Sequence, residues 1–290
     1  EKFASQDKFL NASDTDPALP NNRDWVRQVL AQARSLEGKL PNHEQLILEA
    51  KIESYEVEQM VATAKAASDN WGYNPVRRKD IILKVGAELA NSRGQLLPVM
   101  ISEAGKTFAE ADSELSEAID FANFYAQSID DIREIEKLDG VRFKPHRVVV
   151  VTPPWNFPVA IAAGGVLAAL AAGASVIIKP APQVVNCALS MVEVLWRSGV
   201  PRENLQVALV PDNELGLQLV GHQDVDSVIL TGAFETAQLF KAYRAKTKLF
   251  AETSGKNGIV ISPFADLDLA ANDLAKSAFG HAGQKCSAAS

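Results

Sequence analysis

The chain has 290 residues, and 47% of them are hydrophobic, which is enough for one large or two medium folded domains. Its 29 basic and 36 acidic residues give a net charge of −7, and neither sign gathers in a block, which excludes nucleic acid and membrane surfaces as main partners. Two cysteines, Cys187 and Cys286, are too few for a disulfide framework, so we expect free thiols in a cytoplasmic protein. The four histidines lie far apart, and we expect no metal site.

The first part of the chain is polar and then becomes helical. Residues 1–24 carry prolines and no steady periodicity, which predicts an extended arm. From Trp25 onward, apolar residues recur at spacings of three and four, which predicts amphipathic helices packed on a larger body. These predicted helices span residues 25–36, 56–70, 76–103 and 107–129.

After Gly140 the pattern changes to alternating strands and helices. Short runs rich in Val, Ile and Leu predict buried strands, and longer apolar stretches between them predict helices. The predicted strands are 147–153, 175–180, 205–211 and 227–232, and the predicted helices are 158–173, 184–198, 213–221 and 234–244. A further strand over 256–263 and helix over 266–281 follow.

This alternation predicts an α/β fold with a Rossmann-like parallel sheet covered by helices on both faces. We expect a helical segment and dinucleotide-binding domain over 25–250, and the beginning of a second, catalytic α/β domain over 251–290. Ligands on such sheets bind at the carboxyl ends of the strands. The residues that follow each strand are therefore the candidates for chemistry.

Two candidates follow the first two strands. Asn156 either caps the next helix or directs its amide N–H to an oxyanion. Lys179 is either a solvated charge or a donor to a ribose hydroxyl or a phosphate. Residue type alone leaves both alternatives open.

Three more candidates follow later strands. The turn at Gly232 leads into a helix whose first N–H groups could meet a pyrophosphate, although it lacks the G-x-G-x-x-G pattern. Glu252 and Cys286 suit a general base and a thiolate nucleophile, or else a surface carboxylate and a small buried residue.

Five segments, taken together in this order, resemble the aldehyde dehydrogenase superfamily. They are PWNFP (154–158), KPA (179–181), LTG (230–232), ETSGK (252–256) and GQKCSA (283–288). The segment NASDTDPALPNNRDW, residues 11–25, and GQKCSA are similar to the branch that oxidises L-glutamate γ-semialdehyde, the open form of 1-pyrroline-5-carboxylate. That branch includes the dehydrogenase part of bifunctional proline-utilisation proteins.

The resemblance implies roles for individual residues. Cys286 would be the nucleophile, Asn156 would hold the oxyanion and Glu252 would activate the hydrolytic water. Phe157 and Ser287 would contact the substrate, and Ser287 would help to hold its carboxylate. The cofactor would be NAD, with NADP as the alternative, and its contacts would be Thr152, Pro153, Trp155, Lys179, Ala181, Pro182, Gly216, Thr231, Gly232, Ala233, Thr253 and Ser254.

The sequence departs from the family pattern at several positions. Pro182 stands where many members have a glutamate that repels a 2′-phosphate, so we expect NADP to be tolerated. Ala233 and Ala237 replace a serine and a glycine of the pyrophosphate turn. Family members continue well beyond the nucleophile, so we expect residues 1–290 alone to be inactive, with the last forty residues poorly ordered or covered by protein outside this sequence.

Other functions remain open from the sequence. The chain could be a truncated relative that binds a dinucleotide or a partner, an aldehyde dehydrogenase for another semialdehyde, or a cysteine hydrolase that uses His281. For the enzyme we expect an aldehyde substrate, a homo-oligomer in the full-length form, and fusion to a proline dehydrogenase domain in bifunctional relatives.

Overall fold

A computed structural model describes residues 9–243 and 248–290. Its strands are β1 (Val148–Thr152), β2 (Ser175–Ile178), β3 (Leu205–Val207), β4 (Ser227–Gly232) and β5 (Lys248–Thr253). They form one five-stranded sheet in the order β3-β2-β1-β4-β5, and every neighbouring pair is parallel. The predicted Rossmann-like parallel sheet is confirmed.

The central strands β1 and β2 are buried on both faces, and most of their side chains are apolar. Val149 and Val151 of β1 point into one hydrophobic cluster, and Val148 and Val150 point into another on the opposite face. This is why the strands appear in the sequence as continuous runs of Val and Ile rather than as alternating patterns.

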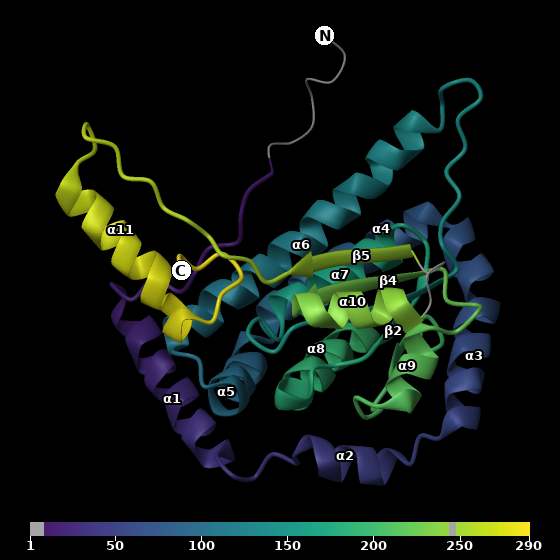
Figure 1. The fold of residues 1–290 in the computed structure, drawn as a ribbon, viewed down its shortest axis with the longest axis horizontal. Coiled ribbons are helices and arrows are strands. Elements are labelled where there is room, and N and C mark those ends of the chain that lie inside the picture. Colours follow the sequence, from purple (N-terminus) through teal and green to yellow (C-terminus); the bar gives the residue numbers. More distant parts are fainter. Residues whose placement is uncertain (1–8, 244–247) are drawn as a thin grey trace.

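Helices cover both faces (Figure 1). The cluster with Val149 is shared with helices α4 (Pro75–Asn91), α5 (Arg93–Ala104), α6 (Phe108–Ile135), α7 (Ala160–Ala171) and α8 (Val185–Arg197), the last preceded by the short helix η1 (Pro182–Val184). The opposite face is covered by α3 (Ser54–Tyr73), α9 (Glu214–Val220) and α10 (Phe234–Tyr243). Helix α1 (Pro20–Leu36) packs on α5, and α2 (His43–Ala50) lies between α1 and α3 along the lower edge in Figure 1.

Part of the predicted N-terminal arm lies along α6. The backbone N–H of Ala12 and the side chain of Asn11 donate to Asp120, and Thr15 donates to Asp112. Arg93 also pairs with Asp112, so one buried carboxylate holds both the arm and α5. Residues 1–8 of the predicted arm, and residue 244 of the predicted helix 234–244, lie outside the described residues.

Several predicted elements were wrong in their bounds. The first helix begins at Pro20 rather than at residue 25, because a proline suits the first turn of a helix. The predicted helix 76–103 is two helices, separated at Ser92, where ψ is 7°. Helix α2 was not predicted; its N-terminus is fixed by a capping box between Asn42 and Gln45, and it buries no side chain.

The last forty residues differ most from the prediction. The predicted strand 256–263 is wrong: within the described part of the chain this segment makes only one isolated bridge, between Asn257 and Ala289. The fifth strand, β5, precedes it instead. Helix α11 (Leu267–Phe279) and the short helix η2 (Gly280–Gly283) follow, and α11 stands apart from the sheet at the end of a long loop in Figure 1. None of the described helices is both long and apolar enough to cross a membrane.

Candidate active site

A pocket of about 730 Å³ opens at the carboxyl ends of the strands. After β3 the chain crosses to the other side of β1 and forms β4, so the order of the strands reverses between β1 and β4. The pocket lies at this switch point, where open α/β sheets bind ligands. The pocket brings together Asn156, Glu252 and Cys286 with all twelve residues predicted to contact the cofactor. The two predicted substrate residues, Phe157 and Ser287, do not line it.

Asn156 lies in the loop between β1 and α7 and does not cap the helix. Its Nδ2 donates to the backbone oxygen of Gln284, at 2.7 Å. The first residues of α7 are held by Glu114 of α6 instead, because Glu114 Oε1 accepts from the N–H groups of Val159 and Ala160 at 2.7 and 3.0 Å. A side-chain amide has two N–H groups, so Asn156 keeps one for a ligand.

Cys286 lies in the segment that faces this loop. Its side chain is exposed at the pocket wall, unlike Cys187, which is buried in α8. Asn257 fixes the segment, since its Nδ2 donates to the backbone oxygens of Cys286 and Ala288 at 2.7 and 2.9 Å. Just before Gln284, the residues His281, Ala282 and Gly283 all have positive φ. Two of these three carry side chains, a strained geometry that is frequent at functional sites.

Glu252 stands near the end of β5. It pairs in register with Thr231 of β4, so the ends of these two strands form one wall of the pocket. The side chain of Glu252 is exposed and contributes to the same lining as Cys286. A solvent-accessible carboxylate of this kind can accept a proton from water.

Lys179 is not a solvated charge. It follows β2 directly, is 8% exposed, and donates a hydrogen bond from Nζ to Oδ1 of Asp212. Gly216 of α9 lies against it: a Cβ there would stand 2.7 Å from the oxygen of Pro211 and 3.2 Å from Lys179 Cε. The close approach of α9 therefore requires a glycine at this position.

A buried ion pair supports the pocket from behind. Lys106 Nζ lies 2.9 Å from Glu114 Oε2, as an ion pair rather than an aligned hydrogen bond. Lys106 also lies over the Phe157 ring, 4.5 Å from its centroid, and 3.4 Å from His281 Nδ1. Burial raises the pKa of Glu114, and Lys106 opposes that shift. Phe157 thus packs on this supporting group rather than facing the pocket.

His281 belongs to the same group of side chains. Its ring packs on Phe157, with centroids 5.1 Å apart, and its Nδ1 lies near Lys106 and Glu110. Burial, and then the charge of Lys106, lower the pKa of His281, which favours the neutral form of its ring. These contacts direct His281 to Lys106 and Phe157, which does not favour the cysteine hydrolase.

Sequence reasoning missed part of the lining. The additional residues are Pro154, Pro180, Gln183, Asp212, Asn213, Leu217, Leu230, Thr236, Leu239, Phe240, Gly283, Gln284 and Lys285. Asp212 and Asn213 follow β3, and the rule that ligands bind after each strand could have pointed to them. Leu239 and Phe240 carried no such signal, because they lie in the middle of α10.

The residues of the pocket fit a dinucleotide. The turn at Gly232 and Ala233 leads into α10, whose first N–H groups have no partners within the helix. The space next to Gly232 is open, because a Cβ at this position would have only Leu230 Cδ1 within 4 Å. The volume lies within the range of about 300–1,000 Å³ that is usual for small-molecule sites. In the part of the chain that the structure describes, no group of three or more His, Cys, Asp or Glu could hold a metal ion.

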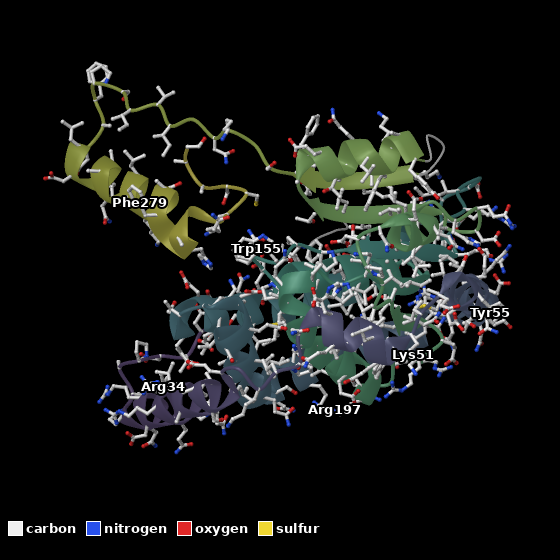
Figure 2. All side chains as sticks on the ribbon, turned by 60° about the horizontal axis from the view of Figure 1, so that its bottom comes forward. Arg34, Lys51, Tyr55, Trp155, Arg197 and Phe279 are labelled. Carbon is white, nitrogen blue, oxygen red and sulfur yellow. The ribbon has the colours of Figure 1, made fainter. Side chains whose placement is uncertain are left out.

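The pocket lies between the body of the molecule, formed by the sheet with its covering helices, and the C-terminal segment, residues 254–290. Trp155, from the loop after β1, lies between the body and the segment that carries Phe279 in Figure 2. Trp155 is 40% exposed, so its ring is accessible at the pocket wall.

Comparison with known proteins is consistent with this site. The family model described as "Aldehyde dehydrogenase family" matches residues 29–290. The chain is 34% identical to 1-pyrroline-5-carboxylate dehydrogenase 2 of Bacillus subtilis over 83% of this chain and 50% of the relative. It is 30% identical to 1-pyrroline-5-carboxylate dehydrogenase of Staphylococcus aureus over 98% of this chain and 62% of the relative. The chain therefore spans about half to three fifths of these relatives.

Solved structures give the same result. Proline utilization A (PutA) from Corynebacterium freiburgense is 43% identical, with a TM-score of 0.84 over 99% of this chain and 28% of that chain. A Thermus 1-pyrroline-5-carboxylate dehydrogenase with bound NAD is 25% identical, with a TM-score of 0.85 over 99% of this chain and 63% of that chain. With its strand-end pocket and a family match over residues 29–290, the chain belongs to the aldehyde dehydrogenase family.

Proposed function

We propose that this chain supplies the cofactor site and the nucleophile of an NAD(P)-dependent dehydrogenase that oxidises L-glutamate γ-semialdehyde to L-glutamate. The observation that carries the proposal is the meeting of Asn156, Glu252 and Cys286 in one pocket at the carboxyl ends of a parallel sheet. The names of the relatives above support the choice of substrate.

The first step is covalent. The thiolate of Cys286 adds to the aldehyde carbon, and the carbonyl oxygen becomes the oxyanion of a thiohemiacetal. The N–H of Asn156 that is not bonded to Gln284, together with the backbone N–H of Cys286, stabilises this oxyanion. Asn257 keeps the nucleophile in place through the backbone oxygen of Cys286.

The second stage oxidises the thiohemiacetal to a thioester and then hydrolyses that thioester. A bound oxidised nicotinamide would supply the acceptor for the hydride that leaves the thiohemiacetal carbon. This leaves a thioester on Cys286. Glu252 takes a proton from a water molecule, which attacks the thioester carbon and releases the carboxylate product and the free thiol.

The strand ends would hold the cofactor. Gly232 and the first turn of α10 would bind the pyrophosphate, and Lys179 would contact the adenosine ribose. Thr152, Pro153, Trp155, Ala181, Pro182, Gly216, Thr231, Ala233, Thr253 and Ser254 complete this part of the lining. NAD is the proposed cofactor. NADP is the alternative, because Pro182 carries no charge that would repel a 2′-phosphate.

The substrate carboxylate is held near Ser287, directly after the nucleophile, whereas Phe157 packs on Lys106 and His281 and supports the pocket wall. Likeness to PutA supports fusion to a proline dehydrogenase domain in the full-length protein. We also expect the full-length form to be a homo-oligomer.

The experiment uses the full-length protein that contains these residues, with NADH formation from the semialdehyde as the readout. Cys286→Ala should abolish turnover while the NAD dissociation constant stays within about twofold, because the thiol is needed for chemistry and not for cofactor binding. Cys187→Ala is the matched control and should keep most of the activity, since Cys187 lies buried in α8 away from the pocket.

Glu252→Gln tests the second step. Acylation should proceed and hydrolysis should slow, so a burst of NADH without steady turnover is expected. Retained turnover in Cys286→Ala would contradict the nucleophile assignment. Cofactor binding without turnover in the wild-type protein would favour a non-catalytic dinucleotide-binding relative.

A further inference from the structure

The pocket contains a carboxylate, that of Asp212, at the end proposed to bind the adenosine. Position 182 is a proline and supplies no carboxylate there. Oδ1 of Asp212 accepts a hydrogen bond from Lys179 Nζ, and both residues line the pocket. The Lys179 side chain is 9% exposed, whereas 64% of the Asp212 side chain is exposed. The lysine is therefore fixed in the wall, and the carboxylate remains accessible to a ligand.

The position of Asp212 follows from the sheet. In nucleotide-binding folds of this kind, an acidic side chain near the end of the second strand hydrogen-bonds the ribose hydroxyls. Here the residues after β2 are Lys179, Pro180, Ala181 and Pro182, none of which is acidic. Strand β3 lies parallel to β2, so the segment after β3 emerges at the same edge and brings Asp212 to Lys179.

We propose that Asp212 is the residue that selects NAD over NADP in this site. Its carboxylate, held by Lys179, accepts hydrogen bonds from the hydroxyls of the adenosine ribose and repels a phosphate at the 2′ position. This inference rests on the proposed function, because it assumes that the pocket binds a dinucleotide.

The charges around Asp212 support selection against a 2′-phosphate. Among the described lining residues the cations are Lys179, which is already paired with Asp212, and Lys285, which lies beside Cys286 in the chain. His43 of α2 interacts electrostatically with both Lys179 and Asp212; burial first, and then the charge of Lys179, lower its pKa. A lowered pKa favours the neutral form of His43, which carries no positive charge for a phosphate.

The backbone around the pair limits rearrangement. A Cβ on Gly216 would approach Lys179 Cε to 3.2 Å, so α9 restricts the lysine from one side. Lys179 therefore has little room to leave Asp212 and turn toward a 2′-phosphate. Loss of the Asp212 charge would free the ammonium group without moving it from the ribose end.

Isothermal titration of the full-length protein with NAD and NADP tests the proposal by binding alone. In the wild-type protein NADP should bind at least tenfold more weakly than NAD. Asp212→Asn keeps the size of the side chain, removes its charge and releases Lys179, so the ratio of the two dissociation constants should fall by about tenfold or more. Asp212→Glu keeps the charge and should retain the preference for NAD.

Glu214→Gln is the matched control, because Glu214 is exposed, lies two residues away and does not line the pocket. It should leave the ratio unchanged. If NAD binds and Asp212→Asn leaves the ratio as it is in the wild type, or if the wild-type protein binds both cofactors equally, the role of Asp212 is overturned while the dinucleotide site stands. If the wild-type protein binds neither cofactor, the proposed function fails with it.

Discussion

The two walls of the pocket are held in place in different ways. On the sheet side, β1 and β2 are buried along their whole length, and the helices around them share two hydrophobic clusters. On the other side, β5 is largely exposed and α11 buries no side chain. Packing fixes the first wall, whereas the second depends on the pairing of β5 with β4 and, beyond β5, on a few polar contacts.

Those polar contacts are specific and few. Asn156 bonds Gln284, Asn257 bonds Cys286, and His281 lies against Lys106. Close by, the exposed fractions of Val260 and Phe264 are 95% and 97%. Apolar side chains exposed to that degree are typical of surfaces that another protein segment covers. The cofactor wall is therefore held by its own packed core, while the nucleophile wall is positioned by strand pairing and individual hydrogen bonds.

The largest expected effect compares two helical leucines, one from each wall. Leu170 of α7 is fully buried, and Leu170→Ala should lower the free energy of unfolding by about 3–5 kcal/mol, because a cavity is left in a packed core. Leu269 of α11 is 56% exposed, and Leu269→Ala should change the free energy of unfolding by less than about 0.5 kcal/mol. Urea unfolding of both variants measures the difference. Equal losses of unfolding free energy would contradict the difference in packing between the two walls.

The second prediction concerns the ion pair at the junction of the walls. Lys106→Met leaves Glu114 buried without its cation and should cost about 3 kcal/mol, the lower end of the range for breaking a buried pair, because Glu114 still accepts two N–H groups from α7. The double variant Lys106→Met/Glu114→Gln should recover part of this loss. Thermal unfolding of the single and double variants gives the coupling, and additive losses would contradict it.

The smallest effect is a pH dependence in the sheet region. The hydrogen bond from His222 lowers the pKa of Glu58 below its ordinary value of 4.5, and the hydrogen bond from Lys65 lowers that of Asp224 below 3.8. Because both values are depressed in the folded state, their stabilisation is complete above about pH 4.5 and is lost as the pH falls through the lower folded values.

Unfolding measured from pH 6 to pH 3 tests this prediction. Asp224→Asn should flatten the acid limb of the stability curve. The control is Asp273→Asn on α11, which should leave the curve unchanged. A parallel acid limb in the Asp224→Asn protein would show that other carboxylates govern it.

The sequence predicted the first wall well and the second poorly, for a physical reason. Strands β1 and β2 are buried throughout and β4 is buried in part, so each requires a run of apolar residues that is visible in the chain. The edge strand β5, KLFAET, needs no such run and was missed. The segment KNGIVISP has a strand-like composition but forms only an isolated bridge at Asn257 in the described structure, so its β-branched residues misled the prediction.

The candidate site shows the same limit. Asn156, Lys179, Glu252 and Cys286 were found because each follows a strand or lies in a recognisable segment. Asp212 was missed although it follows β3, because its partner is not visible in the sequence: the pairing of β3 with β2 brings it to Lys179. Phe157 was assigned to the substrate, yet its ring packs on Lys106 and His281, contacts that come from distant parts of the chain.

Trapping of the covalent intermediate tests the central claim most directly. The full-length Glu252→Gln protein is mixed with NAD and glutamate semialdehyde, quenched in acid and digested, and the peptides are analysed by mass spectrometry. Slow hydrolysis should leave a thioester, which adds the mass of the aldehyde less two hydrogens to the peptide that contains Cys286, while the peptide with Cys187 stays unmodified. An adduct on any other residue, or NADH formation in the burst without modification of Cys286, would contradict the account.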